Sequence, residues 1–127
     1  MADWDSLRNY IKANYKIAED SLDSVKLIFD LDGNRSQAVI VNRVGDTGWA
    51  SISTAVCEAD KLDARAALLR NSQMIIGALA MVENGPIIFR HSFPLENLDI
   101  NEFEEPLRTA VMYGDRLELE LTGEDKF

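Results

Sequence analysis

Two tight turns between apolar runs constrain the fold of this chain more than any other feature. Asp32-Gly33-Asn34 follows residues 25–31, where apolar side chains occupy every second position, and precedes the β-branched run 37–44. Gly45-Asp46-Thr47-Gly48 then separates that run from the loosely alternating residues 49–58. Because Gly and Asn adopt positive φ values at low cost, such segments reverse the chain between neighbouring strands. The sequence therefore predicts three antiparallel strands joined as a meander.

Two further strands are predicted in the second half of the chain. Residues 75–82 are apolar on both alternations and end at Glu83-Asn84-Gly85-Pro86, a strong turn sequence. Residues 87–93 then place two phenylalanines, an isoleucine and a histidine on one face of a fifth strand, and Pro94 ends its pairing.

Helical patterns lie before, between and after these strands. Apolar residues spaced three to four apart predict a first helix over residues 5–15, and an Ala- and Leu-rich composition predicts a second over residues 64–72. A last helix is predicted to begin after Asp99 or Asn101. Pro106 then falls near its first turn, where a missing N–H is best tolerated.

The end of the chain is compatible with two structures. Leu117, Leu119 and Leu121 alternate, so residues 115–121 fit either a further helix or a short strand. Residues 122–127 are expected to form a flexible tail. The prediction is a single α+β domain over residues 1–127, with a five-stranded antiparallel sheet and helices on one face, in the order α-β-β-β-α-β-β-α.

Charge and cysteine content argue against several kinds of partner. The 13 basic and 22 acidic residues give a net charge of −9, which opposes binding to nucleic acid and to anionic membranes. Cys57 is the only cysteine, so it cannot form an internal disulfide, which fits a reducing compartment. The N-terminus does not resemble a signal peptide, and residues 74–82 are far fewer than the ~20 that span a bilayer. We expect a cytoplasmic protein without metal or cofactor that binds neither nucleic acid nor membrane.

The element order and one segment of the second half resemble a known family. The segment reads Ile76-Gly77-Ala78-Leu79-Ala80-Met81, a turn at Asn84-Gly85, then Ile87-Ile88-Phe89-Arg90-His91-Ser92-Phe93-Pro94-Leu95. It is similar to the YbjN-like sensory transduction regulators, which share the fold of type III secretion chaperones. The resemblance implies a bacterial protein with an antiparallel sheet covered by helices, usually dimeric, and it supplies no catalytic residues. Pro106 within the last helix departs from the family pattern.

Asp30 and Asp32 are the strongest candidates for catalytic chemistry. The segment Ile28-Phe29-Asp30-Leu31-Asp32-Gly33-Asn34 resembles the first motif of haloacid-dehalogenase-type phosphatases. In that motif one Asp attacks a phosphoryl group, the second acts as acid or base, and Mg²⁺ offsets the charge. Asn34 stands where the family has Thr, and another strand follows at once instead of a helix. A strand that ends in an Asp-Gly turn is therefore favoured, with the magnesium-dependent phosphatase as an alternative.

The other reactive or aromatic residues have structural explanations. His91 has no identifiable nucleophile beside it, and Cys57 fits a small buried apolar side chain. The acidic cluster at residues 102–105 fits a solvated first helical turn, because the helix dipole favours carboxylates there. Trp4 and Trp49 could anchor a partner, but core packing is expected for both.

The apolar strand surface exceeds what three short helices can cover. Residues 75–82 and 38–41 are apolar on both faces, whereas the helices cover one face of the sheet. The surplus predicts a protein interface, and its candidate residues are Ala67, Ile75, Gly77, Leu79 and Met81. We therefore expect a non-catalytic protein-interaction or regulatory module that forms a homodimer. A chaperone for a secreted protein is the alternative binding role.

Overall fold

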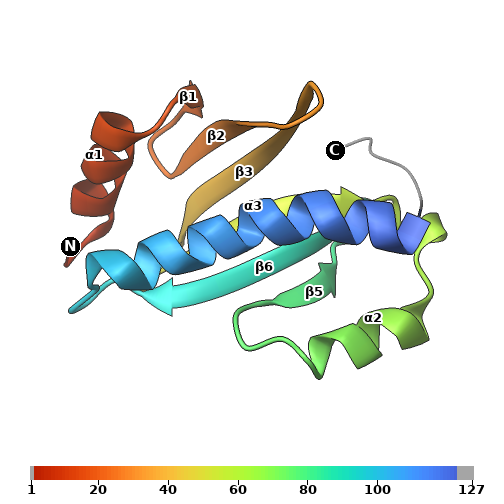
Figure 1. The fold of residues 1–127 in the computed structure, drawn as a ribbon. Coiled ribbons are helices and arrows are strands. Elements are labelled where there is room, and N and C mark those ends of the chain that lie inside the picture. The colour runs from red at the N-terminus through yellow and green to blue at the C-terminus, as the bar shows by residue number, and fades with distance from the viewer. Residues whose placement is uncertain (1, 123–127) are drawn as a thin grey trace.

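A six-stranded antiparallel sheet forms one layer of the computed structural model, and helices lie over one of its faces (Figure 1). The structure describes the backbone of residues 2–122 and the side chains of residues 2–117. The strands, in the spatial order β1-β2-β3-β4-β6-β5, are β1 (Ile17–Asp20), β2 (Ser24–Leu31), β3 (Arg35–Val44), β4 (Trp49–Cys57), β5 (Ala78–Met81) and β6 (Ile87–Pro94). The helices are α1 (Trp4–Asn14), α2 (Ala64–Asn71) and α3 (Ile100–Thr122), with a 3-10 turn at Ala59–Lys61. The predicted class, an antiparallel α+β fold, is confirmed.

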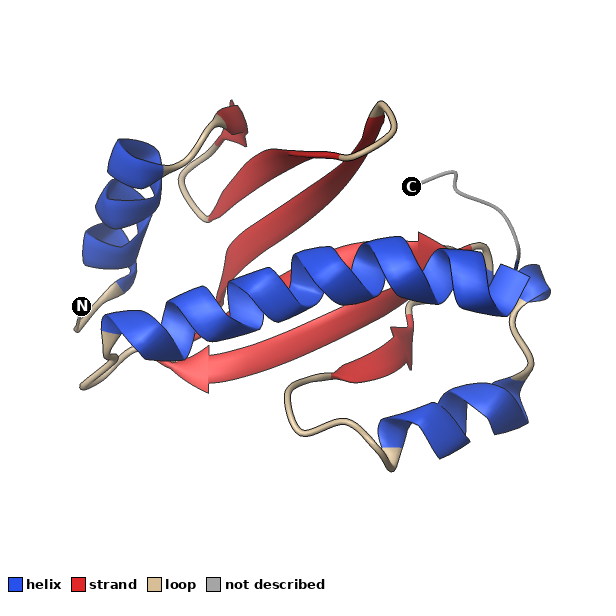
Figure 2. Ribbon diagram, viewed as in Figure 1, coloured by secondary structure: helices blue, strands red, loops and turns tan. Residues whose placement is uncertain are grey.

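The predicted meander is present as β2, β3 and β4 (Figure 2). Val25 lies opposite Val41, and Val41 lies opposite Ile52, so the three strands pair directly with only turns between them. Side chains alternate between the faces of a sheet. These three residues share the face toward the helices and have no exposed surface, so this face carries the core.

The sheet has six strands rather than the predicted five, because residues 17–20 form an additional edge strand. β1 pairs antiparallel with β2, with Ile17 opposite Leu27. Ile17 is the only one of its four side chains that is even half-buried. An alternation this short cannot be recognised in a sequence. Charged side chains on such an edge also discourage pairing with other chains.

The carboxylate of Glu104 links α1 to α3. It accepts hydrogen bonds from the hydroxyl groups of Tyr10 and Tyr15. The hydrogen bond to Glu104 is the main cause that raises the pKa of Tyr10. For Tyr15 the main cause that raises the pKa is burial, and the hydrogen bond to Glu104 is the second. Both phenols therefore remain donors far above neutral pH. The expectation of a fully solvated acidic turn at residues 102–105 is wrong for Glu104, which is half-buried.

Helix α3 continues through residues 115–121, which decides between the two structures left open for that segment. At its start, the Asp99 backbone N–H donates to the Glu102 carboxylate at 2.9 Å, as in a capping box. Pro106 lies in the helix interior and not in the first turn, so that expectation is wrong. None of the helices within residues 2–122 has the length and hydropathy of a membrane-spanning segment. The expected flexible tail at 122–127 lies outside the described residues, apart from the helical backbone of Thr122.

Gly114 lets α3 approach the sheet closely. A Cβ atom at this position would lie 2.4 Å from Nε2 of Gln37 and 3.0 Å from Cγ2 of Thr54. Gln37 is buried on β3, and its amide donates to the Thr54 hydroxyl and to the Ala55 carbonyl oxygen. Because these bonds fix the amide, it cannot move aside at low cost.

We expect Gly114→Ala to lower the free energy of unfolding by about 1–2 kcal/mol. Alanine gains about 1 kcal/mol in helix propensity, but the overlap with Gln37 and the loss of its hydrogen bonds outweigh that gain. Urea denaturation followed by circular dichroism measures the change. In a background that carries Gln37→Ala, Gly114→Ala should cost less stability than it costs in the wild-type protein, because the overlapping amide is absent. An equal cost in both backgrounds would contradict the contact.

Candidate functional site

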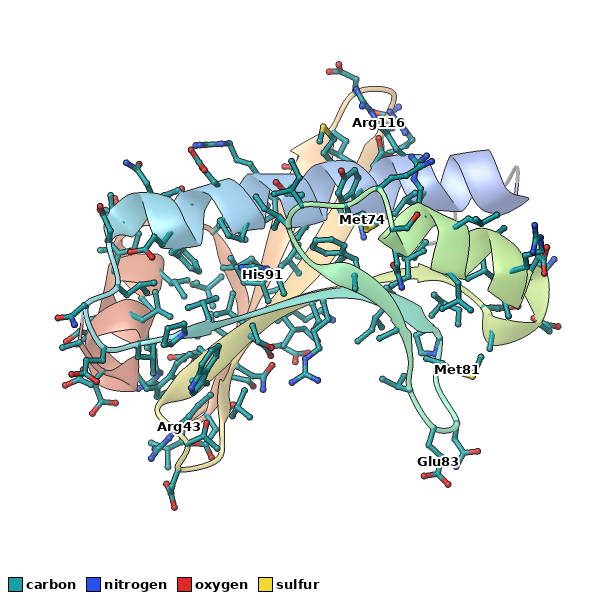
Figure 3. All side chains as sticks on the ribbon, turned by 90° about the horizontal axis from the view of Figure 1, so that it is seen from below. Arg43, Met74, Met81, Glu83, His91 and Arg116 are labelled. Carbon is teal, nitrogen blue, oxygen red and sulfur yellow. The ribbon has the colours of Figure 1, made fainter. Side chains whose placement is uncertain are left out.

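Half of the ten large apolar side chains that are exposed within the described structure lie along one edge of the molecule. This edge is made by α2, the connection after it and β5, and we call it the α2–β5 surface. Its members range in exposed fraction from 38% to 99%: Leu68, Leu69, Ile75, Met81 and Val82. Figure 3 shows Met81 below α2, near the tip of the β5–β6 hairpin. Monomeric proteins rarely leave so many apolar groups together without a binding role.

Helix α2 contributes to this surface because it packs only loosely against the sheet. None of its eight residues is buried, and a helix of this length is unstable without tertiary contacts. A groove of about 210 Å³ lies between α2 and β5, and its lining is mainly apolar. The helix therefore rests against the edge of the sheet and leaves its leucines accessible.

The side chain of Asn71 attaches the end of α2 to the outer edge of β5. Its amide nitrogen donates to the Leu79 carbonyl oxygen at 3.2 Å, and its amide oxygen accepts from the Leu79 N–H at 2.7 Å. Asn71 thus makes the two bonds that a neighbouring strand would make at this residue. This part of the sheet edge is consequently closed to an added strand.

Gly77 determines how much of the predicted strand 75–82 joins the sheet. Its φ of +70° lies in the left-handed region, which interrupts extended backbone. β5 therefore covers only Ala78–Met81, and the prediction of a strand over 75–82 is wrong in its first and last residues. Ile75 projects from the connection before the strand with 99% of its surface exposed.

The five predicted interface residues do not form one exposed patch. Ile75 and Met81 are exposed, whereas Ala67 and Gly77 are half-buried. Leu79 is only 8% exposed, because it lies opposite Phe89 and faces the groove below α2. Ile75 and Met81 are therefore the most accessible of the five in the single chain, and Leu79 is the least accessible.

Sequence reasoning missed the leucines of α2 and the role of Asn71. Ala67 is the only interface candidate from the second predicted helix, but α2 turns Ala67 toward the groove and leaves Leu68 and Leu69 exposed. Consecutive leucines in a helix point about 100° apart, and α2, which contacts only the edge of the sheet, leaves both of them exposed. The adjacent leucines are therefore the sequence feature that could have indicated this exposed surface. No sequence feature could have indicated the Asn71 contact, because that contact depends on tertiary structure.

Asp30 and Asp32 do not occupy the arrangement of the phosphatase motif. Asp30 is exposed on β2 opposite Ser36, and the turn at Asp32 leads directly into β3. Every strand pair of the sheet is antiparallel, whereas that motif requires a parallel sheet with a helix next in the chain. Among the described side chains, no group of three or more His, Cys, Asp or Glu residues is placed to hold a metal ion.

His91 and the two nearby serines lie on opposite faces of the sheet. Ser53 pairs with Arg90, and Ser92 follows His91 directly, so both serines point away from the face that His91 shares with Phe93. The imidazole stacks on Phe93 with ring centroids 6.2 Å apart. Burial lowers its pKa, so it is neutral at neutral pH. The geometry does not bring His91 and either serine together as base and nucleophile.

The two tryptophans have different environments. Trp4 is buried, as expected, and its indole N–H donates to the Leu22 carbonyl oxygen at 2.8 Å, which holds α1 to the β1–β2 turn. Trp49 is 45% exposed at the start of β4, so the expectation of core packing is wrong for it. Cys57 is buried, as expected for a small apolar residue.

Comparisons with known proteins identify a solved structure with a similar fold, but no match from protein families or curated proteins. No protein-family model matches the chain, and no curated protein matches it. Among solved structures, a chain from the HopA1–SchA chaperone–effector complex is similar over 88% of this chain and 89% of its own length. The TM-score is 0.66 at 12% sequence identity, so this likeness establishes the type of fold and nothing more specific.

Proposed function

We propose that this chain is a non-catalytic protein-binding module and that its α2–β5 surface joins two copies as a homodimer. The supporting observation is the concentration of five exposed apolar side chains on one short helix and one edge strand. A standard dimer interface buries about 800 Å² per subunit, and the exposed side chains of α2, the connection after it and β5 would form its apolar centre. A two-fold contact would cover the leucines of α2 and the exposed end of β5 together.

The charge of the chain gives this interface a distinctive salt dependence. Two copies that each carry −9 repel one another, and added salt screens that repulsion. An apolar interface should therefore become stronger as salt rises, whereas one held by ion pairs should weaken.

A chaperone for a secreted protein is the second candidate function. Its support is the overall likeness to a chain of the HopA1–SchA chaperone–effector complex, which concerns the fold. Such a role also requires a protein-binding surface apart from the dimer contact.

We expect the protein to elute as a species of about 28 kDa, twice the 14.2 kDa chain, in size exclusion with light scattering at low micromolar concentration. Ile75→Asp should give a folded 14.2 kDa monomer, because its side chain is exposed and a charge there is unfavourable only in the dimer. Ile100→Asp is the matched control, since Ile100 is exposed at the distant start of α3. A wild-type protein that remains 14.2 kDa at high concentration would refute the dimer.

A further inference from the structure

A second apolar groove lies between β2 and α3, remote from the α2–β5 surface. Its volume is about 370 Å³. Apolar side chains from β2, α3 and the end of α1 form most of its lining: Tyr15, Phe29, Leu31, Leu107, Val111 and Met112. We call it the β2–α3 groove. Its size is in the range of sites that receive one or two large side chains of a ligand, and it is too small for a helix about 10 Å wide.

Both ends of the groove are held by bonds between the elements that form it. At one end, Tyr15 donates to Glu104 of α3. At the other, Arg35 at the start of β3 forms an ion pair with Asp115 of α3. The walls are therefore fixed before any ligand binds, which lowers the entropic cost of binding.

Two arginines of α3 give the rim a positive charge on a chain whose net charge is −9. Arg108 and Arg116 both line the groove, and no ion pair joins either of them to another described side chain. Arg116, labelled in Figure 3, lines the groove together with Leu31, the last residue of β2. Asp115, the acidic residue on the same rim, is already paired with Arg35. Among the described side chains that line the groove, the charge left unpaired is therefore positive, opposite in sign to the molecule as a whole.

The spacing of the arginines sets the spacing of the groups that would pair with them. They are eight residues apart in the helix, which corresponds to about 12 Å along its axis. An extended chain advances about 3.3 Å per residue, so two carboxylates four residues apart are separated by about 13 Å. Side chains at positions i, i+2 and i+4 of an extended segment share one face.

From this complementarity we infer that the β2–α3 groove binds an extended segment of a partner protein in which an apolar residue lies between two acidic residues four positions apart. The apolar side chain enters the groove, and the two carboxylates pair with Arg108 and Arg116. This inference rests on the proposed protein-binding function and names the chemistry of the partner. It uses a different surface from the dimer contact, so the two can fail separately.

The test uses a fluorescein-labelled probe of sequence Ser-Ser-Glu-Ser-Leu-Ser-Glu-Ser-Ser, titrated with the full chain at low salt and followed by fluorescence anisotropy. We expect saturable binding that weakens as salt rises, because it depends on charge pairing at an exposed rim. A probe with both Glu replaced by Lys, and one with Leu replaced by Ser, should each bind at least tenfold more weakly.

Variants of the protein separate the groove from its general charge. Arg116→Glu should weaken binding of the acidic probe at least tenfold. Arg90→Glu is the matched control, because it changes net charge equally at an exposed position of β6 and should leave affinity within twofold. Met112→Glu, at an exposed side chain of the lining, should also abolish binding without unfolding the chain.

Four outcomes would overturn the inference. These are no anisotropy change up to about 1 mM protein, equal loss in Arg116→Glu and Arg90→Glu, equal binding of the Lys-substituted probe, or binding seen only after removal of residues 123–127. The last result would assign the groove to the end of this chain itself. A dimer by light scattering without probe binding would leave the proposed dimer intact and refute the groove alone.

Discussion

Leu79→Asp is expected to destabilise the protein by about 3 kcal/mol or more, a large fraction of the free energy of unfolding of an ordinary domain. Leu79 is 8% exposed and lies between Phe89 on β6 and the groove below α2. An aspartate there would be a buried charge, with no basic side chain among those that line the groove. Such a charge is costly unless it is paired.

Met81→Asp provides the matched control for this prediction. It lies on the same strand and the same face, two residues farther on, but is 71% exposed. In the isolated chain its aspartate remains hydrated, so the stability of the monomer should change by less than about 0.5 kcal/mol. Urea denaturation of both variants, followed by tryptophan fluorescence, gives the comparison. If Leu79→Asp stays as stable as Met81→Asp and becomes monomeric, Leu79 faces a partner and α2 must move away from it.

The fold was predictable where local sequence determines it. Apolar runs before, between and after two Gly-containing turns were sufficient to predict β2, β3 and β4, and helical spacing was sufficient to predict α1. The failures have physical causes. β1 is too short for its alternation to be recognised, and its pairing is established only by contact with β2. A glycine such as Gly114 often ends a helix, but it can also lie within one. Here α3 continues past it, because the next turn buries Leu117 completely.

The candidate site was predictable in position but not in its contacts. An apolar excess around residues 75–82 indicated an accessible surface there, and exposed side chains are present. Which of them are exposed depends on α2, whose placement is set by the Asn71 bonds to Leu79. The β2–α3 groove gave no pattern in the sequence at all. Its two sides come from residues about 80 positions apart, and only the fold brings Phe29 and Val111 together.

Gly77 is the last residue of the exposed connection after α2, and β5 begins directly after it at Ala78. A Cβ atom there would lie 2.4 Å from Cζ of Phe89 and 2.9 Å from the Arg90 carbonyl oxygen. Neither can move easily. The Phe89 ring has no exposed surface and packs edge-on against Tyr113, and β6 is paired on both sides by β4 and β5.

Gly77→Ala is therefore expected to cost about 3 kcal/mol. About 1 kcal/mol arises from holding alanine at positive φ, and the rest from overlap with the Phe89 ring in a closely packed core. Gly48→Ala isolates the first contribution, because Gly48 has φ of +80° and nothing within 4 Å of its Cβ position. Urea denaturation of both variants should show a loss near 1 kcal/mol for Gly48→Ala and a loss at least twice as large for Gly77→Ala.

Equal losses in the two variants would mean that Phe89 yields to the added methyl group and that the core beneath β5 is loosely packed. The double variant Gly77→Ala/Phe89→Leu tests this directly. Leucine in place of Phe89 removes the overlap with the ring, so the effect of Gly77→Ala, measured against Phe89→Leu alone, should become smaller. A cost somewhat above that of Gly48→Ala would remain, because the backbone stays at positive φ and the Cβ atom still lies 2.9 Å from the Arg90 carbonyl oxygen. Since β5 carries Met81 and is preceded by Ile75, the same substitution should also weaken the dimer, whereas Gly48→Ala, in the turn between β3 and β4, should not.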